Sequence, residues 1–144
     1  PDGTLGSIEK KNLQLFYRHS AYADNGFVIT GIVVKLQKDS ETEIRRRMDE
    51  FMRRRREKQP LEYPSAGSVF KRPKGYFAGT LIEQAGLKGY SIGDAVISRK
   101  HAGFIINQGD ATAQDVLALI RHIQNTVHRD FAVDLVCEVR YVGR

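Results

Sequence analysis

The chain has 144 residues, a hydrophobic fraction of 41% and a charged fraction of 28%, which is an ordinary composition for one globular domain with a core. No apolar run approaches the ~18 residues that a membrane span requires, so we expect no membrane partner. The formal net charge of +6 indicates an anionic partner or a solvated basic surface, and composition alone does not choose between them.

The N-terminal part combines turn signals with one strongly apolar run. Residues 27–36 are mostly β-branched, which is typical of a strand buried on both faces. Such a strand needs neighbours on both sides, and residues 1–38 offer few, so we expect them to be the C-terminal remnant of another domain's sheet. Because the first residue is Pro1 and no secretory signal follows it, we also expect the chain to begin inside a longer polypeptide.

An arginine-rich helix is predicted over residues 40–58. Residues 40–43 fit a capping box, apolar residues recur behind them at helical spacing, and Pro60 ends the pattern. The other face carries Arg45, Arg46, Arg47, Arg53, Arg54, Arg55 and Arg56. On this face no aromatic residue interleaves with the arginines, because Phe51 belongs to the apolar side. The pattern therefore favours a solvated linker helix, residues 39–59, and a basic nucleic-acid-binding α+β module is the alternative.

Residues 60–144 alternate between helical and strand patterns. The predicted helices cover 77–85 and 112–127, and the predicted strands cover 95–98, 103–107 and 131–141. Phe77, Leu81, Ile82 and Ala85 form the expected inner stripe of the first helix, which ends at Gly86. Thr112 with Asp115 is the expected cap of the second. This order indicates an α+β fold in which helices pack with a mostly antiparallel sheet.

The clearest chemical signal is a serine loop near the middle of the chain. Ser68 follows a glycine and precedes Lys71 and Arg72, so its hydroxyl lies beside positive charge, which suits an anionic ligand. Over 131–141 the apolar residues alternate on one side of the expected strand, and Glu138 faces the other way. A loop serine, a carboxylate and flanking cations together indicate proton chemistry on an acidic substrate.

Several simpler interpretations compete with this one. Ser68 alone is more often a hydroxyl that caps the following helix. Ser68 and His101 could be half of a hydrolase dyad, although no nucleophile elbow surrounds the serine. Cys137 is expected to be a buried structural thiol, and as the one cysteine it excludes an internal disulfide. No cluster of ligand residues predicts a metal site. A scaffold without activity is a further alternative.

The motifs resemble those of the UDP-N-acetylenolpyruvoylglucosamine reductase family over nearly the whole chain. The segments that carry the resemblance are residues 17–20, 66–73, 81–89, 100–107, 109–112 and 138–143. The similarity is to the substrate-binding C-terminal domain, here 60–144, preceded by the end of the flavin-binding domain. Residues 38–60 are short and contain no tyrosine, so the chain resembles the class that lacks a tyrosine-bearing insertion.

The resemblance implies a role for each candidate residue. Ser68 would donate a proton, Glu138 would stand beside the enol intermediate, and Arg18 would hold the enolpyruvyl carboxylate. Contacts to the uracil, sugar or diphosphate would come from Tyr17, Lys58, Lys71, Arg72 and His101. A serine hydroxyl is a weak acid, so its role requires a strongly basic acceptor and a cationic cleft.

The resemblance also implies cofactors, a substrate and a place in the cell. FAD would take a hydride from NADPH and pass it to UDP-N-acetylglucosamine enolpyruvate, a step of peptidoglycan precursor synthesis in the cytoplasm. The family's flavin-phosphate loops lie upstream of residue 1, so no cofactor-binding residue is assigned. We therefore expect the 144-residue chain by itself neither to retain FAD nor to turn over.

Overall fold

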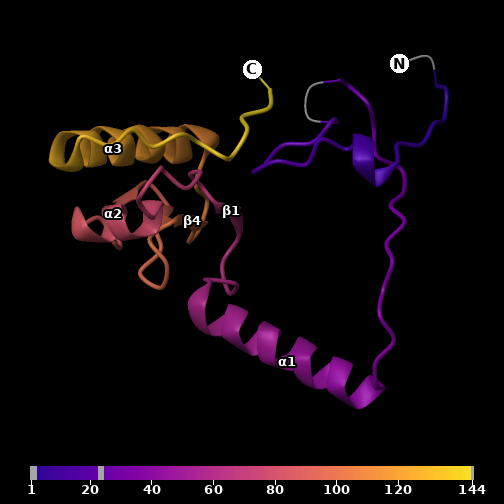
Figure 1. The fold of residues 1–144 in the computed structure, drawn as a ribbon. Helices are drawn as coiled ribbons and strands as arrows, with labels where there is room; N and C mark the ends of the chain where they lie inside the picture. Colours follow the sequence, from indigo (N-terminus) through magenta and orange to yellow (C-terminus); the bar gives the residue numbers. More distant parts are fainter. Residues whose placement is uncertain (1–2, 23–24, 144) are drawn as a thin grey trace. The chain divides into compact units, whose positions relative to one another are not determined.

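The structure, a computed structural model, describes residues 3–22 and 25–143. The chain divides into two compact units, residues 1–40 and residues 41–144 (Figure 1). The second unit contains the long helices and the sheet.

The first unit has little regular structure in its described part. A 3₁₀ turn covers Lys10–Asn12, and an isolated bridge joins Phe16 to His19. Residues 27–39 form neither helix nor strand, and the side chain of Val33 is fully exposed. The prediction of a buried strand over 27–36 is therefore wrong for this structure. The physical reason is that a strand needs hydrogen-bonding neighbours, and no described residue pairs with this segment.

Helix α1, Glu41–Lys58, lies where the helix was predicted. It has no buried residue, and its apolar side chains are exposed, as at Met48 and Phe51. Its arginines pair along the helix with the carboxylates of the same helix, as in Arg45–Glu41, Arg46–Glu43, Arg53–Glu57 and Arg54–Glu50. These pairs agree with a solvated charged face. None of the helices in the described residues has both the length and the apolar character needed to span a bilayer.

A four-stranded antiparallel sheet forms the centre of the second unit. The strands are β1 (Ser65–Ser68), β2 (Ser91–Ile92), β3 (Ala95–Ile97) and β4 (Phe104–Asn107), in the order β1-β4-β3-β2. The register of β3 and β4 pairs Ile97 with Ile105. With the helices, this sheet confirms the predicted α+β class.

Two helices pack with the sheet, α2 (Ala78–Gln84) and α3 (Ala113–Phe131). Helix α2 ends where Gly86 takes a left-handed φ of +72°, after which the N–H of Leu87 donates to Ile82 O at 3.2 Å. Thr112 and Asp115 form the predicted capping box of α3. Phe77, in contrast, does not belong to the inner stripe, because it precedes α2 and is 59% exposed.

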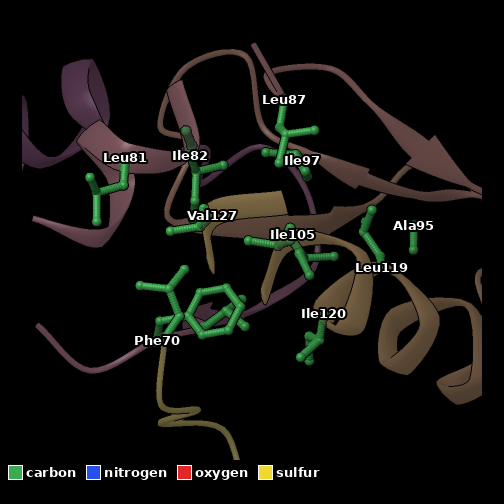
Figure 2. Close-up of a cluster of buried hydrophobic side chains, with 14 residues drawn as sticks. Phe70, Leu81, Ile82, Leu87, Ala95, Ile97, Ile105, Leu119, Ile120 and Val127 are labelled. Carbon is green, nitrogen blue, oxygen red and sulfur yellow. The ribbon is translucent and has the colours of Figure 1, made fainter. Parts of the chain in front are cut away.

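The core lies between these helices and one face of the sheet, as Figure 2 shows. Alternation along β3 and β4 directs Ala95, Ile97 and Ile105 toward the buried side chains of Leu119 and Ile123 on α3. Ile82 of α2 and Val127 of α3 are fully buried in the same cluster. Val69 and Phe70, immediately after Ser68, are also core residues, so the serine loop is anchored directly on the core.

The C-terminal segment differs in part from the predicted strand over 131–141. Phe131 still belongs to α3, and Ala132 caps the helix in the left-handed conformation with φ 54°. Beyond it the chain runs back beside α3, where the Gln124 side-chain amide donates to Leu135 O at 2.8 Å. The predicted alternation of burial is present up to Cys137, with Leu135 buried and Val136 exposed, but it does not continue to Tyr141, which is 55% exposed. Only the part around Cys137 finds a backbone partner, an isolated bridge to Phe70.

Candidate functional site

Ser68 is the last residue of β1, and the buried residues Val69 and Phe70 follow it. It pairs with Phe104 of β4, and the next N–H, that of Val69, donates to Gly103 O at 3.0 Å. The register shifts between Ser65 and Ser68, where Gly67 takes a φ of +85° that favours glycine. Val69 and Phe70 are 3% and 4% exposed, whereas Ser68 is exposed. The loop thus presents the hydroxyl residue to solvent from a fixed backbone.

Glu138 is brought beside this loop by backbone pairing. The N–H of Glu138 donates to Val69 O at 2.8 Å, and the N–H of Lys71 donates to Val136 O at 2.8 Å. These bonds flank the Phe70–Cys137 bridge, so the C-terminal segment runs antiparallel to the chain that follows Ser68. Glu138 is half-buried and its Oε2 atom is shielded from solvent. The structure therefore brings together the serine loop and the carboxylate that the sequence predicted as partners.

The structure excludes the two simpler roles for Ser68. It caps no helix, because the next helix begins at Ala78 with Phe77 at its N-cap and no side-chain cap bond. A dyad with His101 is also not formed. The Nδ1 atom of His101 accepts the N–H of Gly103 at 3.0 Å, and no hydrogen bond among the described residues joins this ring to Ser68.

Lys71 and Arg72 continue the loop on its exposed side. The backbone of Lys71 is fixed by its bond to Val136 O, and the residue is exposed. The guanidinium of Arg72 lies over the ring of Phe77, with 3.9 Å between Cζ and the ring centroid. Two cations thus follow the serine on a rigid segment, which supports an anionic ligand at this edge.

His101 is held in a tight turn next to β4. Ser98 is 1% exposed, and its Oγ accepts the N–H groups of Lys100 and His101 at 3.2 and 3.3 Å. The imidazole ring packs edge-on against Phe104, whose backbone pairs with Ser68. Because Nδ1 accepts a hydrogen bond from a backbone N–H, the neutral ring carries its proton on Nε2 and can donate it to a ligand.

Three further predicted residues lie in other parts of the chain. Tyr17 and Arg18 lie in the unit of residues 1–40, at the tip of the turn closed by Phe16 and His19, and Arg18 has a left-handed φ of 55°. The Arg18 guanidinium lies 5.4 Å from the centre of the Tyr17 ring. Lys58 is the exposed last residue of α1. Their roles stay predictions.

The resemblance implies a flavin, and the glycine-containing loop before α3 could bind its diphosphate only if the backbone N–H groups of the loop were free. Its backbone N–H groups, residues 109–112, donate to side chains of Asn107, Asp94 and Asp115 at 2.8–3.1 Å. Because the protein's own oxygens bind these N–H groups and two of the side chains are carboxylates, the loop does not fit a diphosphate.

The described residues also lack a metal centre, because nowhere among them do three His, Cys, Asp or Glu side chains gather closely enough to hold an ion. Cys137 is not a nucleophile of the site. Partial burial raises the pKa of its thiol, which disfavours the thiolate, and the side chain packs against the core. The prediction of a structural thiol agrees with this environment.

A polar pocket of about 320 Å³ opens on a different part of the sheet. Its floor includes Val96 and Ile106, and its rim includes the ion pair of Glu62 and Lys100 at 3.2 Å. A backbone hydrogen bond and then the Lys100 ammonium hold the pKa of the Glu62 carboxyl below its ordinary value. None of the sequence-predicted site residues lines this pocket, and one of its two lining cations, Lys100, is already paired.

Sequence reasoning missed residues that position the site rather than face it. Ser98 fixes the turn of His101, and Phe77 lies under Arg72. The role of Ser98 could have been predicted, because a serine hydroxyl often accepts the backbone N–H group two residues further along the chain. Gly75 is a turn signal that could have indicated the role of Phe77, but helical spacing placed this residue on the inner face.

Comparison with known proteins agrees with this geometry. Residues 59–142 match the family model described as UDP-N-acetylenolpyruvoylglucosamine reductase, C-terminal domain. The chain belongs to this family. The matched range contains β1, the serine loop, both packed helices and Glu138, so the family's C-terminal domain is the part that carries the candidate site.

Individual relatives extend the similarity beyond the domain. The chain is 53% identical over 142 residues to UDP-N-acetylenolpyruvoylglucosamine reductase of Clostridium novyi, covering 99% of this chain and 46% of that protein. It is 49% identical over 144 residues to the reductase of Limosilactobacillus reuteri, covering 100% and 48%. The chain thus spans about half the length of the curated relatives it matches.

A solved structure of the reductase family matches in three dimensions. The crystal structure of UDP-N-acetylenolpyruvylglucosamine reductase (MurB) from Thermus caldophilus superposes with a TM-score of 0.76 at 38% identity. The match covers 94% of this chain and 48% of that one. The predicted α+β fold is therefore shared with a solved reductase, and no similarity to a nucleic-acid-binding protein supports the alternative.

Proposed function

We propose that this chain is the substrate-binding portion of a UDP-N-acetylmuramate dehydrogenase, which reduces the enolpyruvyl ether of UDP-N-acetylglucosamine enolpyruvate. The observation that carries the proposal is the pairing of the Ser68 loop with the Glu138 segment. The N–H of Glu138 donates to Val69 O at 2.8 Å, beside two exposed cations. Membership of the reductase family supports the reaction class.

Within this proposal Ser68 and Glu138 act in the protonation of the reduced substrate. Reduction of the vinyl ether leaves a strongly basic carbon next to the substrate carboxylate, and the Ser68 hydroxyl donates its proton there. Glu138 stands beside the enol intermediate. Lys71 and Arg72 bind the diphosphate and His101 donates through Nε2 to the nucleotide, while Tyr17, Arg18 and Lys58 complete the contacts. Arg18 is assigned to the enolpyruvyl carboxylate because its planar fork matches two oxygens.

The cofactors and the location belong to the same proposal. FAD and NADPH would supply the hydride in the complete protein, and the N–H groups of residues 109–112 do not fit the flavin diphosphate because side-chain oxygens already bind them. We propose the cytoplasm as the location and peptidoglycan precursor synthesis as the process. The proposed partner is the UDP-sugar, without nucleic acid or membrane. The assignment of residues 1–38 to a flavin-binding domain and 39–59 to a linker is likewise proposed.

Calorimetric titration with UDP-N-acetylglucosamine tests the proposal. We expect the 144-residue chain to bind this sugar nucleotide. Lys71→Ala and Arg72→Ala should both weaken binding, because each removes a cation from the proposed diphosphate site. Lys74→Ala is the matched control, since it removes an exposed lysine from the same loop. Unchanged affinity in both site variants would contradict the placement, and tight salt-sensitive binding of DNA would favour the nucleic-acid alternative.

A further inference from the structure

Arg72 is held by the two residues at positions 76 and 77. Its guanidinium carbon lies 3.9 Å from the centroid of the Phe77 ring, and its Nε donates to Tyr76 O at 3.4 Å. At this ring distance the cation is attracted by the negative face of the aromatic ring. Phe77 is 59% exposed, so its ring contributes to the surface under Arg72 rather than to the core.

A turn explains how Phe77 reaches Arg72. The N–H of Tyr76 donates to Pro73 O at 3.2 Å, and Gly75 takes a φ of +80° at the third position of this turn. A type II turn requires such a φ at this position, which favours glycine. The chain therefore folds back directly after Arg72 and places the ring of Phe77, the second aromatic residue after it, against its guanidinium.

This arrangement leaves one part of Arg72 available. The ring of Phe77 covers one face of the guanidinium and Nε is already a donor, whereas no hydrogen bond from the described residues engages the two terminal nitrogens, Nη1 and Nη2. Two parallel N–H groups in one plane match two oxygens of a phosphate. An arginine whose side chain is already ordered also loses less rotamer freedom when it binds.

We propose that Phe77 is a positioning residue that orients the guanidinium of Arg72 for bidentate binding of a diphosphate. The inference rests on the proposed function for the identity of the ligand and goes beyond it in assigning Phe77. An exposed cation–π contact of this kind corresponds to about a two- to fivefold change in affinity.

The test is a double-mutant cycle on the full chain. Wild type, Phe77→Leu, Arg72→Ala and the double variant are titrated with UDP-N-acetylglucosamine and, separately, with inorganic pyrophosphate. Phe77→Leu keeps apolar bulk and removes the aromatic face. We expect it to weaken both ligands about two- to fivefold in the presence of Arg72 and to have no effect in the Arg72→Ala background. Phe51→Leu on α1, also an exposed phenylalanine, is the control and should bind like wild type.

An NMR measurement makes the positioning visible without any ligand. The Nε–H signal of Arg72 should be shifted upfield by the ring current of Phe77, and Phe77→Leu should remove this shift while the backbone spectrum of the core stays unchanged. A purely structural role for Phe77 would instead disturb the core signals. Absence of the upfield shift in the wild type would overturn the arrangement.

The outcomes separate this inference from the proposed function. Binding of the UDP-sugar that is lost in Arg72→Ala but unaltered in Phe77→Leu would overturn the positioning role and leave the proposed function standing. Pyrophosphate binding that depends on Arg72 and Phe77 together, without UDP-sugar binding, would support the positioning role and overturn the proposed function. If neither ligand binds, or if Phe77→Leu weakens binding equally without Arg72, the positioning role is wrong.

Discussion

At the scale of single residues, the site depends on where the backbone holds a few side chains. Ser68 is exposed, yet its neighbours Val69 and Phe70 are buried, so the hydroxyl cannot move far without disturbing the core. Glu138 is fixed from the other side by its bond to Val69 O. A proton donor that is positioned before the substrate arrives loses little freedom in the reaction.

The residue-level prediction concerns the proposed proton donor and is tested in the full-length protein with its proposed flavin. Ser68→Ala should leave reduction of the enzyme by NADPH nearly intact and slow reoxidation by the enolpyruvyl substrate by a factor on the order of 10² to 10⁴. Glu138→Gln should slow the same half-reaction and spare substrate affinity, because it keeps the hydrogen-bonding shape. Stopped-flow absorbance separates the two half-reactions. Normal reoxidation in Ser68→Ala would remove the serine from the proton step.

At the scale of elements, the two long helices differ in what stabilises them. Helix α3 has a capping box and buries Leu119, Ile120, Ile123 and Val127. Helix α1 buries no residue, and ion pairs between its own side chains run along its surface. Exposed pairs of this kind contribute little free energy, so α3 depends on packing and α1 on local propensity.

The cap of α3 gives the first element-level prediction. Thr112→Ala should lower the free energy of unfolding by about 1 kcal/mol, because the Asp115 N–H loses its acceptor. The N–H and hydroxyl of Thr112 also hold the pKa of Asp115 below its ordinary value. Because the pKa of Asp115 is lower in the folded state, its carboxylate stabilises the fold at pH values above the ordinary pKa of 3.8. This stabilisation is lost as the pH falls and the carboxylate becomes protonated. Urea titrations at neutral and acidic pH should therefore show a smaller effect of Thr112→Ala in acid.

The packing of the same helix gives a second element-level prediction. Ile123 is 1% exposed, and Ile123→Ala should cost about 2–5 kcal/mol of unfolding free energy through the cavity that it leaves. Met48→Ala on α1 is the matched control, because this side chain is 64% exposed and its removal should change stability by less than about 0.5 kcal/mol. Equal losses in the two variants would mean that α1 packs against a core.

At the scale of the whole molecule, regular structure is concentrated in residues 41–144. The sheet, its two packed helices and the serine loop share one core. Residues 1–40 form a separate unit whose apolar segment, 27–36, is exposed along its length. The candidate site residues from Ser68 onward therefore share one scaffold, while Lys58 lies on α1 and Tyr17 and Arg18 belong to the first unit.

Hydrogen exchange tests this division directly. Amides of β3 and β4 should exchange only through global unfolding, whereas amides of residues 27–36 should exchange with opening free energies close to zero. The reason is that β3 and β4 pair in register over a buried face, and the segment has no backbone partner in the described structure. Protection of 27–36 comparable to that of β4 would indicate that this segment pairs as a strand after all.

Local patterns by themselves determined the helices and the fold class of this protein. The caps at Thr112 and Gly86 and the apolar spacing of α3 act over a few residues, so they could be read before any tertiary contact was known. The serine loop could also be read locally, because Ser68 and the cations Lys71 and Arg72 lie within five residues of one another in the chain.

Only the tertiary structure decided which distant segments meet. Residues 27–36 have the composition of a buried strand, but composition cannot supply the neighbours that such a strand requires. Phe77 matched the helical spacing, yet a turn at Gly75 placed it over Arg72 instead. Glu138 reaches the Ser68 loop because the chain turns back at Ala132 and pairs with Val69 and Lys71. The first and the last of these outcomes depend on long-range backbone pairing, which no local pattern encodes, whereas Phe77 was misplaced because a local turn overrode the helical spacing.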